Sequence, residues 1–328
     1  RFDPMQVVAD ALTARGLPRA SVATIGNYDG IHIGQRAVLR KVVERSRAEN
    51  LPSVVVTFEP HPLTVLSPAQ APPRLLTVEQ KARRLGDCGI DVLAVIPFTE
   101  LFAATTAEAF VREVLVARVG IRELYVGRRF AFGSKRSGNL ELLARLGEEL
   151  GYSVVGLDEE RIDGEAVSST RIRQAIAAGE VEAAARLLGR PYSLTGEVVA
   201  GARRGRTLGF PTANLAPDGQ MLPSKGVYAT RIALPGIPEG VDSVTNIGVR
   251  PTVGGDPRCV VETHLLDFDR DLYGARVELH FHRRLRNEML FPSVADLAAQ
   301  IGQDVVRSRE YFSAFRGSTE SRSRFSAD

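Results

Sequence analysis

The sequence predicts two folds in one chain: a Rossmann-like α/β domain with a parallel sheet, followed by an antiparallel β-barrel that carries a C-terminal helix. In the first half, short apolar runs alternate with segments that have helical spacing, the pattern of a parallel sheet covered by helices. From residue 192 onward, short strands punctuated by glycine and proline follow one another without helical spacing, which favours an antiparallel barrel. Residues 293–312 return to helical spacing, so we expect a helix on the outside of the barrel.

Length and composition agree with two globular domains. The chain has 328 residues, about twice a typical domain, with 44% hydrophobic and 25% charged residues. No apolar run approaches the roughly 20 residues that span a membrane. The first residues also lack the basic-then-apolar pattern of a signal peptide. We therefore expect a cytoplasmic protein.

Cysteines and charge narrow the possible functions. Cys88 and Cys259 form no CxxC pair, so neither a disulfide framework nor a zinc site is supported. The net charge of +3 is small, and a pI near 9.0 is compatible with nucleic acid or with a protein that handles several phosphates.

The α/β half begins with a β-prone run at residues 21–25, a glycine-rich turn at 26–35 and a helix at 36–50. Strand, glycine-rich turn and helix form the first unit of a nucleotide-binding sheet, with a helix N-terminus available for phosphate. Further strands are expected at residues 53–58, 92–97, 124–126 and 152–157, and further helices at 77–86, 106–119, 172–178 and 180–188. Residues 189–192 break the last helix, so we place the α/β domain at residues 1–188.

Two loops and one helix start in this half attract attention. Two prolines follow the strand at 53–58 and place His61 at its carboxyl end, where ligands of open α/β sheets collect. The basic stretch at 127–138 is a solvated loop on its composition alone. Ser169 and Thr170 precede a helical pattern and suit either a helix cap or an anion site, which rest on the same physics.

The barrel domain is expected at residues 189–315. Its strands are predicted at residues 192–200, 226–233, 243–247, 260–267 and 277–283. Residues 316–328 are rich in serine and charge and have no apolar spacing, so we expect a flexible tail there.

The stretch GARRGRTLGFPTANL at residues 201–215 holds the densest set of candidate site residues. Gly201, Gly205 and Arg206 can bring bare backbone N–H groups and positive charge to a phosphate. Thr212 and Asn214 alternate, so an extended segment puts both on one face, where their oxygens suit Mg2+. An arginine-rich turn followed by an edge strand is the alternative interpretation.

This stretch resembles the signature of the riboflavin kinase family, in which GFPTAN marks the ATP and magnesium site. The match continues through the segments GVYA (226–229), NIGVRPT (246–252), VETHLLD (261–267), DLYG (271–274) and LRNE (285–288), in the order of the family. In bacteria this kinase is usually the C-terminal half of a bifunctional riboflavin kinase/FAD synthetase.

The resemblance implies roles for individual residues of the barrel. Gly209, Pro211 and Asn246 would contact ATP, Thr212 and Asn214 would bind Mg2+, and Arg286 would contact the flavin. A carboxylate usually takes the proton of the attacking alcohol in such chemistry, and Glu262 lies where the family has its catalytic glutamate. A lone glutamate in a strand is more often a surface residue. The family motif around Glu262 instead favours a catalytic role.

The first half resembles the nucleotidyltransferase superfamily, whose GxFDGxHxGH motif places two histidines on the triphosphate. The first is present as His32, while Gln35 replaces the second; a turn histidine bonded to backbone is the alternative for His32. The resemblance further implies phosphate contacts and flavin contacts. Those for phosphate are Gly26, Asp29, Gly30, Gly34, Gln35, Ser169, Thr170 and Arg171, and those for flavin are Phe58 and Pro60.

Arg129 is a second departure from the family, which has a short polar or acidic residue there. We therefore expect FMN synthesis from riboflavin and a weaker FAD synthesis, with ATP and Mg2+. A kinase with a degenerate first domain is the alternative. A nucleic-acid binder is disfavoured, because the chain has no Trp and only 6% aromatic residues to stack on bases. No membrane partner is expected, and the oligomeric state is open.

Overall fold

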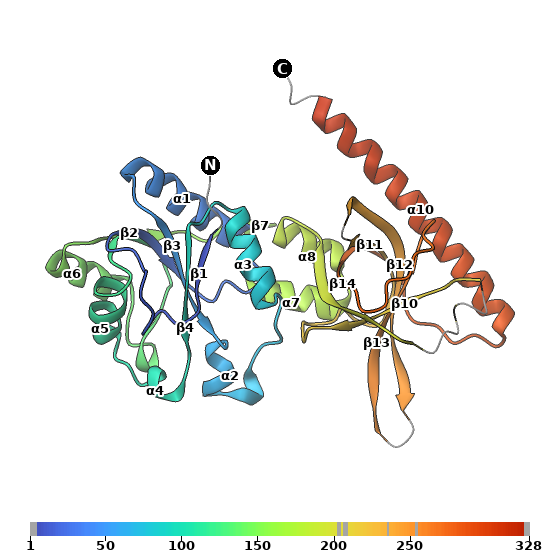
Figure 1. The fold of residues 1–328 in the computed structure, drawn as a ribbon, viewed down its shortest axis with the longest axis horizontal. Helices are drawn as coiled ribbons and strands as arrows, with labels where there is room; N and C mark the ends of the chain where they lie inside the picture. The colour runs from blue at the N-terminus through green and yellow to red at the C-terminus, as the bar shows by residue number, and fades with distance from the viewer. Residues whose placement is uncertain (1–4, 202–204, 206–208, 235, 253–254, 325–328) are drawn as a thin grey trace. The chain divides into compact units, whose positions relative to one another are not determined.

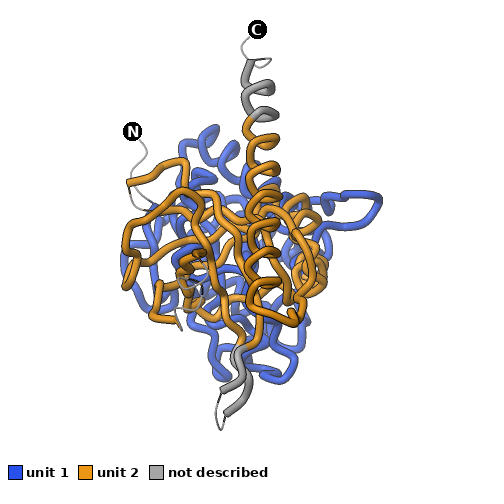
Figure 2. Tube along the Cα trace, turned by 90° about the vertical axis from the view of Figure 1, so that its right-hand side faces the viewer, with its two compact units in different colours: residues 1–169 blue, residues 170–328 orange. Residues whose placement is uncertain are grey.

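The computed structural model describes residues 5–201, 205, 209–234, 236–252 and 255–324. The chain forms two compact units, Arg1–Ser169 and Thr170–Asp328 (Figure 2). The first contains the predicted parallel sheet and the second the predicted barrel, so the fold class is confirmed.

Within the described residues, the first unit is a six-stranded, all-parallel sheet in the order β1-β4-β3-β2-β5-β6 (Figure 1). Its strands are β1 (Gln6–Val8), β2 (Ser21–Ile25), β3 (Ser53–Glu59), β4 (Val92–Pro97), β5 (Ile121–Gly127) and β6 (Ser153–Leu157). Strand β1, which the sequence did not predict, pairs with β4 at the sheet edge.

Helices and short segments connect these strands. The helices are α1 (Ile33–Glu49), α2 (Pro62–Leu66), α3 (Val78–Asp87), α4 (Glu100–Ala103), α5 (Ala107–Ala109) and α6 (Leu140–Leu150). The shorter segments are 3-10 turns at Pro68–Gln70 and Ser134–Arg136 and the two-stranded pair β7 (Arg161–Ile162) and β8 (Glu165–Ala166). The helix expected at 106–119 starts as α5 and continues as a π-helical segment, Phe110–Val116. Helix α6 was not predicted.

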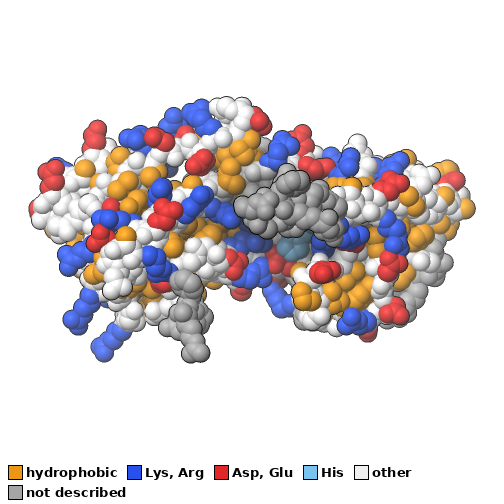
Figure 3. All heavy atoms as spheres, turned by 90° about the horizontal axis from the view of Figure 1, so that it is seen from above, with side chains coloured by type: hydrophobic (Ala, Val, Ile, Leu, Met, Phe, Trp, Pro, Cys, Tyr) orange, Lys and Arg blue, Asp and Glu red, His pale blue; other side chains and the backbone are white. Residues whose placement is uncertain are grey.

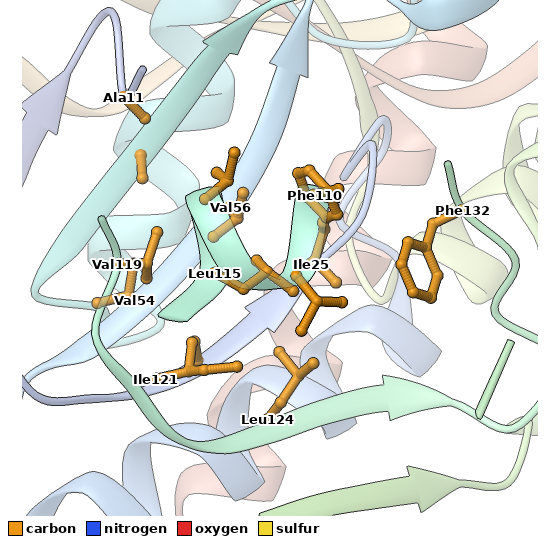
Figure 4. Packing of buried hydrophobic residues seen from close by; sticks show 14 of the residues in the cluster. Ala11, Ile25, Val54, Val56, Phe110, Leu115, Val119, Ile121, Leu124 and Phe132 are labelled. Carbon is orange, nitrogen blue, oxygen red and sulfur yellow. The ribbon is translucent and has the colours of Figure 1, made fainter. Parts of the chain in front are cut away.

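The sheet is apolar on both faces, as its continuous β-branched runs predict. Along β3, Val54 and Val56 enter one core while Val55 enters the other. Figure 4 shows Val56 on the same side of the sheet as Leu115 and Phe110 of the π-helical segment. Helices α1 and α3 cover the opposite core, and the sheet is thereby a rigid base for the loops at its carboxyl edge.

The second unit is a closed antiparallel barrel in the order β10-β13-β12-β11-β14-β9. Its strands are β9 (Tyr192–Val199), β10 (Ala213–Pro217), β11 (Gly226–Leu234), β12 (Ile237–Thr252), β13 (Gly255–Leu265) and β14 (Arg276–Arg286). Strands β12 and β13 are longer than predicted. The interior contains apolar side chains and threonine hydroxyls that are hydrogen-bonded to one another. Thr245 Oγ1 lies 2.7 Å from Thr230 Oγ1 and 2.9 Å from Thr263 Oγ1.

The described part of the second unit contains the helices α7 (Ser169–Ala178), which starts at the last residue of the first unit, α8 (Val181–Leu188) and α10 (Val294–Arg324). Arg284 Nη1 donates to Ala178 O at 2.9 Å, so the end of α7 is tied to β14. The compact units therefore divide before α7, whereas the sequence-based boundary at residue 188 follows α8; that boundary remains a prediction about the two sequence families.

Helix α10 is longer than predicted, while the flexible tail from residue 316 remains a prediction. The helix continues to Arg324, and residues 325–328 lie outside the described chain. Once a helix is formed, each further residue adds one hydrogen bond without a new nucleation cost, so the absence of apolar spacing does not end it. Arg316 Nη1 also donates to Asp242 Oδ2 at 2.6 Å, which fixes the helix to the barrel beyond the predicted end at Phe312.

Candidate active sites

Two loops of the first unit follow neighbouring strands at the point where the sheet changes winding direction. Strand β2 pairs with β3 on one side and with β5 on the other. The glycine-rich turn from Gly26 follows β2, and the basic loop with Arg128 and Arg129 follows β5. Carboxyl ends of adjacent parallel strands at such a switch point are where α/β sheets bind ligands. The topology therefore brings the two sequence-predicted loops to one edge.

The glycine-rich turn is held in an unusual backbone conformation by buried bonds. Tyr28 and Ile31 have φ of 47° and 45°, and Gly30 has φ of 109°. The Tyr28 hydroxyl lies 2.7 Å from Thr24 Oγ1, and burial raises the pKa of Tyr28. The Asp29 carboxylate accepts from the backbone N–H of Leu75 at 3.0 Å, which ties the turn to the segment before α3. Strained backbone that its surroundings hold in place is a feature of functional sites.

His32 and Gln35 form a reciprocal cap at the start of α1. Gln35 N donates to His32 Nδ1 and His32 N donates to Gln35 Oε1, both at 3.2 Å. Because Nδ1 accepts a bond, the proton of neutral His32 lies on Nε2, which makes Nε2 a donor. A helix N-terminus attracts anions, so His32 stands where a phosphate is favoured. A β-carbon built at Gly34 would lie 3.3 Å from His32 Nδ1, so this glycine gives the imidazole room.

The predicted anion segment at 168–173 is divided between the two units. Ser169 Oγ donates to Asp29 O at 2.5 Å, so this residue contacts the glycine-rich turn directly. Thr170 and Arg171 lie in the first turn of α7; Thr170 is exposed and Arg171 is half-buried.

The predicted flavin contacts Phe58 and Pro60 lie at the carboxyl end of β3. Phe58 is half-buried in a cluster of phenyl rings, with ring centroids 5.7 Å from Phe98 and 6.1 Å from Phe102. Pro60 follows a cis peptide bond. The amide of Asn27 in the glycine-rich turn lies 3.1 Å from His61 Nε2, so the two loops are in contact.

Charged groups behind these loops were missed by the sequence analysis. Lys81 of α3 is 7% exposed, and its ammonium lies 3.9 Å from Glu59 Oε2. Burial lowers the pKa of Lys81, while Glu59 and Asp29 oppose that shift. Arg74 also pairs with Glu59. A lysine that a helix buries is indistinguishable in the sequence from a solvated one. The side chain of Arg129, in contrast, is 79% exposed, and its Nη1 lies 3.6 Å from Glu159 Oε2.

In the barrel, one row of residues across adjacent strands unites four residues of the predicted kinase site. Asn214 of β10 is in register with Glu262 of β13, which is in register with Asn246 of β12. The row continues through Val227 of β11 to Arg286 of β14. Neighbouring strands lie about 4.8 Å apart, so the carboxylate of Glu262 stands between two amide side chains.

This row lies on the outer face of the barrel. The residues that alternate with it are buried inside: Leu215 on β10, Val261 and Thr263 on β13, and Ile247 on β12. Since side chains alternate across a strand, the half-buried Asn214, Glu262 and Asn246 point outward. A β-carbon at Gly248 would lie 2.9 Å from Glu288 Oε1 and 3.2 Å from Asn246 Nδ2, which places Glu288 beside the row.

Two glycines lie against the predicted magnesium ligands. A β-carbon at Gly201 would collide with the Asn214 amide, and one at Gly205 would collide with Phe210 O and come within 3.3 Å of Thr212 Oγ1. Their bare backbone thus leaves room around a hydroxyl and an amide oxygen, the hard ligands that Mg2+ accepts. Across the described ranges, no cluster of three or more His, Cys, Asp or Glu side chains is arranged for a metal.

The remaining predicted residues of this site have defined places. Gly209 has φ of 81°, a conformation that favours glycine, and Pro211 is exposed just before β10. Arg206 lies outside the described residues. Arg286 is 13% exposed and donates through Nε to both carboxylate oxygens of Asp304 on α10, at 3.1 and 3.0 Å. Its guanidinium is 5.6 Å from the Phe291 ring centroid.

The surface charges and the helix lengths bear on nucleic-acid and membrane partners. On the face shown in Figure 3, basic and acidic side chains are interspersed. Within the part of the chain that the structure describes, no helix has the length and apolar character needed to cross a membrane.

Both units have relatives among known proteins. Residues 15–171 match the family described as FAD synthetase, and residues 188–312 match the family described as riboflavin kinase. A bifunctional riboflavin kinase/FMN adenylyltransferase of Escherichia coli (strain K12) is 42% identical over 292 residues, 89% of this chain and 92% of that protein. The protein of the same name from Pseudomonas fluorescens is 40% identical over 305 residues, 93% of this chain and 97% of that protein.

One solved structure shares the fold over nearly the whole length. It is described as a macrolide-efflux protein from Streptococcus pneumoniae, with a TM-score of 0.83, 30% identity, and coverage of 94% of this chain and 99% of that chain. Two families matched in succession and relatives that extend across both units lead to one conclusion: the chain belongs to the family of bifunctional riboflavin kinases/FMN adenylyltransferases.

Proposed function

We propose that the chain carries out two successive reactions at two separate sites. The barrel transfers the γ-phosphate of ATP to the ribityl 5'-hydroxyl of riboflavin and yields FMN. The α/β unit joins FMN to the AMP of a second ATP and yields FAD and pyrophosphate. The observation that carries this proposal is the cross-strand row, which aligns Asn214, Glu262 and Asn246 beside the glycine-containing loop.

In the kinase reaction, Glu262 accepts the proton of the ribityl hydroxyl as its oxygen attacks the γ-phosphorus. The new P–O bond forms while the bond to the β-phosphate oxygen breaks, and ADP leaves. Thr212 and Asn214 would hold Mg2+, whose charge neutralises the phosphates during transfer. Gly209, Pro211 and Asn246 border the nucleotide. Arg286, held by Asp304, borders the flavin end of the row.

In the adenylyl transfer, a phosphate oxygen of FMN attacks the α-phosphorus of ATP and pyrophosphate leaves. His32 donates from Nε2 to the phosphates at the start of α1, where backbone N–H groups add to the field. The family resemblance assigns the departing pyrophosphate to Ser169, Thr170 and Arg171, and of these Ser169 lies in the same unit as His32 and donates to Asp29 O in the glycine-rich turn. Phe58 offers an aromatic wall for the isoalloxazine ring.

Support for both activities comes from the length of the match. The curated relatives cover both units, and the predicted site of the α/β unit is at the carboxyl ends of its strands, where such sheets bind ligands. The name of the Streptococcus pneumoniae relative refers to efflux, whereas the groups at both described sites are those that phosphoryl and adenylyl transfer use. The chemistry of those groups is the basis of the proposed function. We also propose that the chain acts in the cytoplasm.

The direct test is to incubate the protein with riboflavin, ATP and Mg2+ and to separate the flavins by chromatography. FMN should appear first and FAD later. FMN without FAD would leave a kinase with an inactive first unit. If neither FMN nor FAD were formed, the proposal would be overturned.

We also propose that FAD synthesis is slower than FMN synthesis. Gln35 cannot carry the positive charge of a second histidine, and one lost donor to a transition-state oxyanion costs on the order of 10² to 10³ in rate. The variant Gln35→His, alone and with Arg129→Asn, should speed FAD formation from FMN. Equal rates of both reactions in the unaltered protein, with no gain in the variants, would refute the attenuation but not the function.

A further inference from the structure

The Gly-Phe-Pro segment before β10 is attached to the barrel by one histidine side chain. His264 Nδ1 lies 2.8 Å from Pro211 O, and its ring meets the Phe210 ring edge-on with centroids 5.5 Å apart. A carbonyl oxygen can only accept a hydrogen bond, so His264 Nδ1 carries a proton and donates it. The side chain thus makes one polar and one aromatic contact to consecutive residues.

These contacts act where the strand ladder has not yet begun. The pairing of β10 with β13 starts at Ala213, opposite Thr263. Phe210 N donates to Gly205 O at 2.8 Å, a bond within the loop itself. Thr212 therefore has the ladder on its C-terminal side and the His264 bond on its N-terminal side.

His264 also shares a rigid element with the proposed base. Glu262 and His264 are two residues apart on β13 and point outward together, about 7 Å apart by the rise of a strand. Thr263 between them is 2% exposed and bonds inward to Thr245, which holds this part of β13 in place. Strand β13 thus carries both the carboxylate and the attachment point of the loop.

We infer that His264 is a positioning residue: it fixes the distance between Thr212, on the loop, and Glu262, on the strand, and thereby the place of Mg2+ and its nucleotide. The inference rests on the proposed kinase function. Misplacement of a positioned group by about 1 Å can cost on the order of 10² in rate. Loss of the His264 contacts should therefore lower the rate of phosphate transfer.

Three substitutions separate the two contacts. His264→Phe keeps a ring against Phe210 but removes the donor, His264→Asn keeps an N–H donor near the position of Nδ1, and His264→Ala removes both. His280→Phe is the matched control, because it changes a half-buried histidine on β14, a strand that does not pair with β13.

The first readout needs no turnover: Mg2+–ADP is titrated into the protein–riboflavin complex and flavin fluorescence is followed. His264→Phe should raise the midpoint about tenfold, the value of one net hydrogen bond, while His264→Asn should remain within about threefold of the unaltered protein. Riboflavin affinity without nucleotide should be unchanged. Kinetics should agree, with kcat/KM for ATP lower and FAD formation from supplied FMN unaffected.

Different failures have different meanings. Unchanged Mg2+–ADP midpoints in the Phe and Ala variants would overturn the positioning role, as would an Asn variant as impaired as the Phe variant. Parallel losses of melting temperature and riboflavin affinity would show a merely structural residue. If the unaltered protein made no FMN, the proposed function would fail, while the fluorescence titration would still decide the role of His264.

Discussion

The two loops that we propose to bind phosphate are built in opposite ways. The turn of the first unit is part of the core: Asp29 is 9% exposed and His32 is 8% exposed. The Asp29 carboxylate accepts from the backbone of Leu75 in another segment, and His32 Nδ1 accepts from the backbone of Gln35 at the start of α1. The loop of the barrel lies on an outer strand face, where Thr212 and Asn214 are half-buried. In the first unit, the proposed binding groups also contribute to the stability of the fold. In the barrel, we expect the proposed binding groups to contribute little to stability.

This contrast predicts how substitutions divide between stability and activity. In the first unit, a change in the turn should lower both together. In the barrel, a change in the loop should lower activity alone. The following variants measure that division.

Among variants of the two loops that test this division, the largest effect is expected from Gly201→Ala. The added methyl group meets the Asn214 amide, a side chain that can swing aside, so the fold should persist while the magnesium ligand moves. We expect FMN formation to fall by about 10²-fold, the cost of a misplaced group, with the melting temperature unchanged. Gly30→Ala is the counterpart, because φ of 109° is outside the range of alanine. It should destabilise the first unit by about 1–3 kcal/mol and lower FAD formation with it. A Gly201 variant that melted early yet phosphorylated normally would reverse the contrast.

A smaller effect concerns acid and the barrel alone. His282 is 8% exposed and packs against Phe312 and Phe315 of α10. Burial lowers the pKa of His282 to about 4; Arg231 and His280 add to the shift and Asp242 opposes it. The unfolded chain binds the proton below about pH 6.5, so this stability is present above that pH and is lost as the pH falls towards 4.

Between pH 7 and 5.5 the loss should be about 1 kcal/mol. Denaturant unfolding followed by a probe on α10 measures it, and His282→Phe, which keeps a ring in place, should flatten the slope. An equally steep slope in that variant would assign the acid sensitivity to other groups.

The sequence predicts architecture well here because periodicity is a local property. The buried run Val54 to Val56 feeds two cores, and this double burial is visible as an uninterrupted β-branched stretch. The continuation of helix α10 beyond Phe312 was not predicted, because helix propagation there leaves no apolar pattern.

Site geometry was predictable only in part. Alternation predicts Thr212 and Asn214 on one face, but the register that sets Glu262 between Asn214 and Asn246 depends on pairing between distant strands. The same holds for His264 and Lys81, whose partners are far away in the chain. The cap between His32 and Gln35 is local, and the alternative of a turn histidine bonded to backbone anticipated the bond from Gln35 N, although histidine is not among the usual capping residues.

The central claim is that two separable sites act in sequence on one chain, and a mixing experiment tests it most directly. Glu262→Gln removes the proposed base, which should cost about 10² to 10⁴ in FMN formation. His32→Asn keeps a capping oxygen at the start of α1 but loses the Nε2 donor. Each variant is given riboflavin, ATP and Mg2+, separately and in an equal mixture, and FAD is measured by chromatography. We predict little FAD from either variant alone and substantial FAD from the mixture, because one supplies FMN that the other adenylylates. FAD at the unaltered rate from either variant alone, or none from the mixture, would contradict the account.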